Sequence, residues 1–323
     1  MAGIIVACAS GAQAQQTIKF GGATINDSLH RWQETFKKQI EASTRGRIKV
    51  EVYPAGQLGS IPRQIEGLQL GSQEMFIAVP AFLVGLDKRF MVTDAPGVIT
   101  DLDHGFRVTH DMAFAKAFWN LGEPKGVKGV GMFCSELATY VTRTPVRKLE
   151  DFKGKKIRVF ASPIEREAMR RLGVAGTPMA LGEVLPALQQ GALDGARSGV
   201  SIWTSMKFHT AAKYLTRTDE QAICSMGMVA KSWFEKLSPD HQNAVLNAAA
   251  DADEDVQEWS NTTREKQFED WTKAGGEVIR LTPADQAELV KLMATVGDDV
   301  VKENPEIAEM YKLFRETAER TRR

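Results

Sequence analysis

The sequence predicts an α/β fold made of two similar units, and three observations support this prediction. Strands and amphipathic helices alternate along the chain. A helix-to-strand junction spelled Leu-Gln-x-Gly-x-x-acidic occurs at 68–74 and again at 188–194. The length of 323 residues is long for one domain and comfortable for two. Because the repeated junction stands in two similar strand–helix series, we expect one architecture to be used twice.

In the first unit, segments of helical period alternate with segments of period two. Leu29, Trp32 and Phe36 recur on one face of a helix, and Gly71 supplies a C-terminal stop for the next helix. The predicted order is strand 17–22, helix 28–43, strand 47–54, helix 62–70 and strand 74–79. This β-α-β-α-β order predicts parallel pairing of the strands.

The second unit repeats the pattern. A helix near 104–120 and strands at 126–134 and 139–143 lead into it. Gly191 again stands where a helix ends before a strand. The predicted order is strand 155–159, helix 163–172, helix 183–190 and strand 194–198.

The last section begins with a long helix. Ser238 is a good N-cap and Pro239 suits the first helical turn, and no breaker occurs before Gly275. A helix over 239–273 would be roughly 50 Å long, enough to lie across both units. The elements expected after it are a strand at 277–281 and helices that begin at Thr282-Pro283.

Residues 1–14 are predicted to be a signal peptide that is truncated at its start. An apolar run covers Ala2 to Ala9, and Ala12-Gln13-Ala14 is a small-x-small cleavage pattern, but no basic segment precedes the run. Cleavage after Ala14 would leave the mature protein in the periplasm and remove Cys8. The alternatives are a cytosolic N-terminus and a lipoprotein attached through Cys8.

Composition and motifs exclude several classes of function. The 41 basic and 41 acidic residues balance, so no overall field attracts nucleic acid or an anionic membrane. The chain has no G-x-S-x-G elbow, Walker loop, H-E-x-x-H or C-x-x-C, and its five histidines are scattered. We therefore expect a binding protein with no metal and no cofactor, and an enzyme is the alternative.

Arg158 is the residue with the strongest chemical signal. In the strand 155–159, Ile157 and Val159 take one face and Arg158 the other, near the carboxyl end where open α/β sheets bind ligands. Ser162-Pro163-Ile164-Glu165 predicts a capping box at the start of the next helix, whose free amides favour anions. A guanidinium there can bind a carboxylate with two hydrogen bonds. The alternative is a surface salt bridge.

Several motifs in their order resemble the TRAP-type (tripartite ATP-independent periplasmic) solute-binding proteins over residues 17–315. They are YPAGQLGS, EGLQLGS, LEDFKGKKIRV, LGVAGTPMALGEVLPALQQGALDG and KFHTAAKYLT. The resemblance implies a two-lobe periplasmic binding protein fold, in which each lobe is a mixed sheet flanked by helices. Hinge strands would join the lobes.

The family layout also implies the domain boundaries and the partners. Lobe I would comprise 15–134 with about 225–262, lobe II about 135–224 with about 263–323, and the helix at about 239–273 would span both. The expected partners are a small carboxylate ligand and the large and small subunits of a membrane permease, and the protein itself is expected to be a monomer. A sensor kinase is the alternative protein partner.

The resemblance assigns the carboxylate clamp to Arg158, and departures from the family shape the rest of the expected site. Ser198 replaces an asparagine that touches ligand, and Ala138 and Val79 stand where relatives that bind sialic acid carry Arg and Glu. Leu181 stands in the region where those relatives carry an aromatic residue. These residues, with Phe82 lining the body of the site, predict a roomy, mostly apolar cleft.

An apolar cleft predicts an aromatic or otherwise apolar monocarboxylate as the ligand, and a keto acid or a dicarboxylate is the alternative. Phe82 and Trp203 are candidate stacking partners, although Trp203 also suits the core. By the family layout, Cys134 and Cys224 lie on neighbouring hinge strands, either as a disulfide or as two buried thiols.

Overall fold

The computed structural model describes residues 15–322, so the predicted signal peptide at 1–14 lies outside the described residues. The strands are β1 (Gln16–Gly22), β2 (Ile48–Tyr53), β3 (Met75–Ala78), β4 (Val127–Thr142), β5 (Lys156–Val159), β6 (Ala175–Pro178), β7 (Gly195–Ser198), β8 (Tyr214–Ala230) and β9 (Glu277–Arg280). The helices are α1 (Ser28–Ser43), α2 (Ile61–Leu70), α3 (Leu102–Thr109), α4 (Met112–Trp119), α5 (Pro163–Arg171), α6 (Leu181–Gln189), α7 (Val200–Ser205), α8 (Lys231–Phe234), α9 (Pro239–Lys273), α10 (Pro283–Met293), α11 (Val296–Val301) and α12 (Pro305–Thr321).

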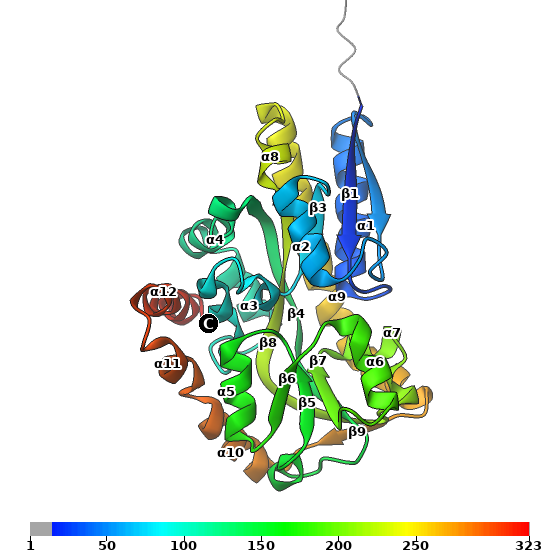
Figure 1. Cartoon of the computed structure of the whole chain (residues 1–323), viewed down its shortest axis with the longest axis vertical. Helices are drawn as coiled ribbons and strands as arrows, with labels where there is room; N and C mark the ends of the chain where they lie inside the picture. Colours follow the sequence, from blue (N-terminus) through cyan, green and yellow to red (C-terminus); the bar gives the residue numbers. More distant parts are fainter. Residues whose placement is uncertain (1–14, 323) are drawn as a thin grey trace, which may run out of the picture.

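The strands pair into one mixed sheet in the order β2-β1-β3-β8-β4-β7-β5-β6, with β9 alongside β8. As expected, β1 is parallel to β2 and β3. In the second unit β5 is parallel to β7 and also to β6, a strand that the sequence did not predict. The long strands β4 and β8 are antiparallel to each other and to their other partners in the main path of the sheet. In Figure 1, β4 and β8 run between an upper part, with β1, β3, α1 and α2, and a lower part, with β5–β7 and α5–α7.

The predicted long helix is found as α9. The Ser238 hydroxyl accepts a hydrogen bond from the His241 amide at 3.3 Å, and Pro239 occupies the first turn. The helix packs against α1 and β4 and also against α7 and β9, so it contacts elements of both the upper and the lower part. The division of the chain into two lobes at the stated boundaries stays a prediction.

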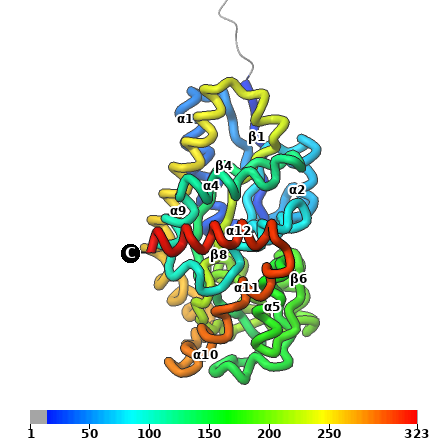
Figure 2. Tube along the Cα trace, turned by 90° about the vertical axis from the view of Figure 1, so that its left-hand side faces the viewer, coloured from blue at the N-terminus to red at the C-terminus, as the bar shows by residue number. Residues whose placement is uncertain are grey.

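The C-terminal helices contact α3 and α4 as well as α5 of the lower part. Figure 2 shows α12 crossing the side of the molecule, with α11 and α10 below it. α12 packs against α3 and α4, and His104 Nε2 lies 2.8 Å from the Ala318 carbonyl oxygen. α11 packs against α5, where Arg171 binds Asp299 at 2.6 Å.

Three predicted elements, one helix and two strands, differ from the structure. The segment 104–120 forms two helices because the Asp111 carboxylate caps a new one, accepting from the amides of Ala113 and Phe114 at 3.2 Å. The strands predicted at 126–134 and 139–143 belong to the single strand β4. Shifts in the β4–β8 register between 134 and 136 and between 137 and 139 explain the broken alternation in the sequence.

Cys134 and Cys224 are register partners in β4 and β8 and form a disulfide. Both cysteines are buried. Of the two alternatives left open by the sequence, the structure shows the disulfide.

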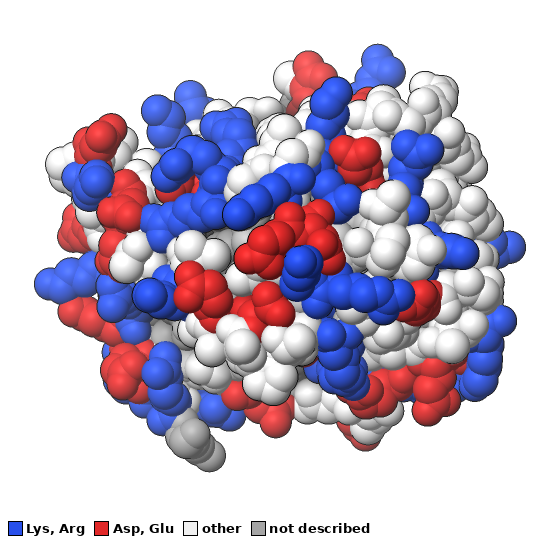
Figure 3. All heavy atoms as spheres, turned by 90° about the horizontal axis from the view of Figure 1, so that it is seen from below, with Lys and Arg blue, Asp and Glu red and all other residues white. Residues whose placement is uncertain are grey.

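The surface carries no strong excess of one charge on the face seen in Figure 3, where basic and acidic side chains intermingle. Within residues 15–322, none of the helices has the length and apolar composition needed to cross a bilayer.

Candidate ligand-binding site

Arg158 lies on β5 and is 1% exposed. Its strand neighbours Ile157 and Val159 pack into the core on one face of the sheet. Arg158 leaves the other face, beside its register partner Ala196 in β7. The alternation read from the sequence therefore orients this side chain correctly, but it is buried rather than in a surface salt bridge.

The Arg158 guanidinium is held without a counter-ion. Its Nε donates to the Met179 carbonyl at 2.9 Å and its Nη1 to the Arg197 carbonyl at 3.2 Å. It also lies over the ring of Phe160, 4.9 Å from the centroid. Among the described residues, no carboxylate oxygen approaches it within 4.0 Å. Burial lowers the pKa of Arg158 to about 10, although the more distant Glu165 acts in the opposite direction.

A small set of apolar side chains, called here the apolar group, gathers near the carboxyl ends of β3 and β5. Phe82 and Phe160 approach edge to face, with ring centroids 6.0 Å apart. The structure brings three predicted residues, Val79, Phe82 and Ala138, into this group. Phe160 joins it through β5 and was not predicted. The members of the apolar group are Val79, Ala81, Phe82, Ala138, Phe160 and Ile223.

Ser198 ends β7 on the same face as Arg158, two residues beyond Ala196. Its hydroxyl is buried and has no hydrogen-bond partner among the described residues. The backbone there is fixed, because Thr139 donates through Oγ1 to the Ser198 carbonyl at 3.0 Å. A buried hydroxyl with no partner is costly, so this atom is a candidate ligand contact.

The structure does not bring Leu181 into the apolar group. Leu181 begins α6 and packs with Val184 and Trp203 in a separate core on that side of the sheet. Trp203 is fully buried there and donates through Nε1 to Thr139 Oγ1 at 3.0 Å, so its place is in the core.

Arg197 is a buried arginine that sequence reasoning missed. It follows Ala196 in β7, so its side chain leaves the face opposite to Arg158. There it pairs with Glu165 of α5 and with Glu220 of β8, the latter at 2.9 Å. The partners of the Arg197 guanidinium, called here the Arg197 network, are Glu165, Glu220, Gln221 and Tyr140.

The capping box predicted at Ser162 is wrong. Ser162 precedes α5 but makes no side-chain cap, and the Glu165 carboxylate pairs with Arg197. Asp94, which ends the 3₁₀ segment η2 (Lys88–Asp94), comes close to Ser162 and Glu165. Burial, reinforced by the charge of Glu165, raises the pKa of Asp94 well above its usual range.

Glu136 of β4 is a further buried acid that the sequence did not single out. Its Oε1 accepts a hydrogen bond from the Ser201 amide at 3.1 Å, and its Oε2 is buried without a partner among the described residues. Burial raises the pKa of Glu136 to about 7, although the Ser201 hydrogen bonds act to lower it.

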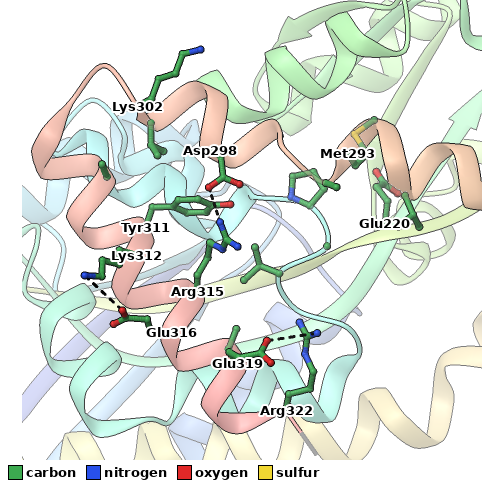
Figure 4. Close-up of a pocket in the computed structure, with 18 residues that line it drawn as sticks. Glu220, Met293, Asp298, Lys302, Tyr311, Lys312, Arg315, Glu316, Glu319 and Arg322 are labelled. Atoms are coloured by element: carbon green, nitrogen blue, oxygen red, sulfur yellow. Dashed lines mark hydrogen bonds and ion pairs between the residues drawn. The ribbon is translucent and has the colours of Figure 1, made fainter.

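A groove of about 810 Å³ lies elsewhere, between α10–α12 and residues 96–98. Arg158 and the other predicted site residues do not line it. Its basic side chains already have acidic partners, so it offers no free cation to a carboxylate. Figure 4 shows three such pairs, Asp298–Arg315, Lys312–Glu316 and Glu319–Arg322.

Arg158 at the carboxyl end of β5, within a mixed sheet crossed by a long helix, is the arrangement implied by the family resemblance. The family model for bacterial extracellular solute-binding proteins, family 7, matches residues 22–304. The chain belongs to this family of TRAP solute-binding proteins.

Known relatives of this TRAP protein extend the match over nearly the whole chain. The 2,3-diketo-L-gulonate-binding periplasmic protein of Escherichia coli is 26% identical over 311 residues, which cover 95% of this chain and 94% of that protein. A TRAP protein structure from Desulfovibrio salexigens with bound orotic acid has a TM-score of 0.89 at 24% identity. The match covers 95% of this chain and 99% of that one. A TRAP protein structure from a Bordetella species, with density assigned to pantoate, has a TM-score of 0.85 at 26% identity. The match covers 94% of this chain and 99% of that one.

These matches confirm the two-lobe α/β fold class and the periplasmic location. As a TRAP solute-binding protein, the chain is the binding component of a transporter and not an enzyme.

Proposed function

We propose that this TRAP protein binds an organic acid whose carboxylate is clamped by Arg158. The observation that carries the proposal is the buried guanidinium without a counter-ion. A buried charge that lacks a partner is strongly unfavourable, and a ligand carboxylate would supply the missing charge with two hydrogen bonds. Because Arg158 is only 1% exposed, the parts that cover it must move to admit a ligand.

The body of the proposed ligand is compact and largely apolar, with an aromatic or a branched aliphatic monocarboxylate as the best candidates. Val79, Ala138 and Ile223 offer no polar atom from their side chains, so a polyol would lose hydrogen bonds to water there at about 1–3 kcal/mol each. Phe82 and Phe160 offer aromatic surface. The relative from Bordetella, whose density is assigned to pantoate, supports a branched acid. Because a relative binds the sugar acid diketogulonate, the test below also includes a sugar acid.

The proposed partner is a TRAP membrane permease, built from a large and a small membrane subunit, to which a monomer of this protein delivers the acid. The family assignment supports this partner.

A panel of acids tests the ligand class. Thermal shift followed by calorimetric titration would compare benzoate, cinnamate and a branched aliphatic acid with succinate and galacturonate. A ligand at 100 times its Kd adds about 2.7 kcal/mol to the free energy of unfolding, which such a screen detects. We expect the apolar acids to bind most tightly. Tight binding of succinate or galacturonate, with failure of every apolar acid, would contradict the apolar body of the ligand.

A further inference from the structure

Glu136 lies beside the predicted ligand contact Ser198. It belongs to β4, two residues before Ala138 of the apolar group, and its side chain packs against the backbone of Gly199. The approach is so close that a Cβ on residue 199 would lie 2.3 Å from Glu136 Cγ. Only glycine fits there. The Glu136 carboxyl therefore lies next to the end of β7, where Ser198 is located.

One oxygen of Glu136 has a structural role and the other does not. Oε1 accepts from the Ser201 amide at 3.1 Å, which satisfies the start of α7, whose N-cap Gly199 has no side chain to do so. Oε2 is buried with no hydrogen-bond partner in residues 15–322, and so is Ser198 Oγ. The Ser201 hydroxyl, also unpaired in this part of the chain, lies near Glu136 and contributes to lowering its pKa. Unsatisfied polar atoms gathered in this way are unfavourable in a folded protein, unless another molecule satisfies them.

The charge state of Glu136 suits hydrogen bonding to a ligand. Burial raises its pKa to about 7, with Asp27 of the α1 start acting in the same direction and Arg264 of α9 acting against it. Near neutral pH the carboxyl is present in both forms. It can therefore accept a hydrogen bond from a hydroxyl or donate one to it.

The position relative to Arg158 suits one small molecule. The Arg158 Nη1 donates to the carbonyl of Arg197, the residue directly before Ser198, at 3.2 Å, so the guanidinium and the end of β7 are neighbours. One compact acid can therefore meet both.

We propose that Glu136 is a specificity-determining residue, whose Oε2 acts with Ser198 Oγ to bind a hydroxyl on the body of the ligand. The inference rests on the proposed function, since it takes Arg158 as the anchor of the carboxylate. It selects, among compact acids, those that carry one well-placed hydroxyl on an otherwise apolar body.

Pairs of acids that differ by a single hydroxyl test this inference. Titration calorimetry would compare butyrate with 2-, 3- and 4-hydroxybutyrate, and phenylacetate with mandelate. We expect at least one hydroxy acid to bind about tenfold more tightly than its partner without the hydroxyl, the scale of one buried hydrogen bond at about 1.4 kcal/mol. The Ser198→Ala and Glu136→Leu variants should reduce this preference to about threefold or less.

Two controls separate this role from a structural one. Glu136→Gln keeps an oxygen for the Ser201 amide, so it should fold as the wild type does while its preference among the three hydroxybutyrates changes. Glu235→Gln, at a side chain that is 61% exposed, should change nothing.

Binding of the plain acids with no preference for any hydroxy acid would overturn this inference alone. The same holds if the preference persists in both Ser198→Ala and Glu136→Leu. Failure of every acid to bind would overturn the proposed function together with the inference.

Discussion

Arg158 donates a hydrogen bond through Nη1 to the carbonyl oxygen of Arg197 at 3.2 Å, yet the two guanidinium groups lie on opposite faces of the sheet. The Arg197 side chain meets two carboxylates, from Glu165 and Glu220. The Arg158 side chain meets none among the described residues. The same residue type is thus neutralised within the protein on one face and left without a counter-ion on the other. That difference identifies the face on which a ligand anion is needed.

Replacing Arg197 should destabilise the fold severely. The variant Arg197→Met would leave Glu165 and Glu220 buried without their cation, and breaking a buried pair in this way costs about 3–5 kcal/mol. Urea unfolding of the variant and the wild type measures the difference. A loss below about 1 kcal/mol would show that the Arg197 network contributes little to stability.

The variant Asp94→Asn should stabilise the protein, and the effect should grow with pH. Burial and the charge of Glu165 raise the pKa of Asp94 in the folded protein above its unfolded value. As pH rises from about 4, the unfolded state releases this proton first, so the wild type loses stability that the asparagine variant keeps. The free energy of unfolding of both proteins, measured at pH 5 and at pH 8, tests this direction. A stability gain for Asp94→Asn that is larger at pH 5 than at pH 8 would contradict the raised pKa of Asp94.

His110 should stabilise the protein more at low pH than at high pH. Burial disfavours its charged form, but the hydrogen bond and the charge of Asp253, 3.3 Å away, outweigh this and raise the pKa of His110. A raised histidine pKa gives stability that is complete below about pH 6.5 and lost as pH rises through the folded value. We expect His110→Gln to cost about 1 kcal/mol more at pH 5.5 than at pH 8.5. An equal loss of unfolding free energy at both pH values would contradict the ion pair with Asp253.

The disulfide between Cys134 and Cys224 should be present in the secreted protein. For protein that starts at Gln15, the intact mass should be two hydrogens below that of the reduced chain, and no thiol should react before reduction. The double variant Cys134→Ser, Cys224→Ser should lose about 2–4 kcal/mol of unfolding free energy. Two thiols that react without reduction would show that the bridge does not form.

Local signals predicted much of the fold. Ser238 and Pro239 mark the start of α9, and Gly71 marks the end of α2. The alternation around Ile157 and Val159 placed Arg158 on the correct face of β5. Each of these signals acts within a few residues, so it is visible in the sequence whatever the rest of the fold does.

Partners that are distant in the chain could not be predicted in this way. Glu165 is spaced for a capping box, but its carboxylate pairs with a buried guanidinium 32 residues away. Glu136 lies next to Gly199 only because β4 pairs with β7. Its role at α7 compensates for a glycine N-cap, a feature that becomes visible only when the two segments are together.

The measurement that tests the central claim most directly is calorimetric titration of the tightest-binding acid into wild type, Arg158→Ala and Arg158→Lys. We expect Arg158→Ala to weaken binding by about 2–5 kcal/mol, because the ligand carboxylate would lose its partner in a buried site. Arg158→Lys should not restore the affinity, since an ammonium cannot present two parallel donors. The wild type should also reject the amide of the same acid. Affinity equal to that of the wild type in a folded Arg158→Ala protein would contradict the carboxylate clamp.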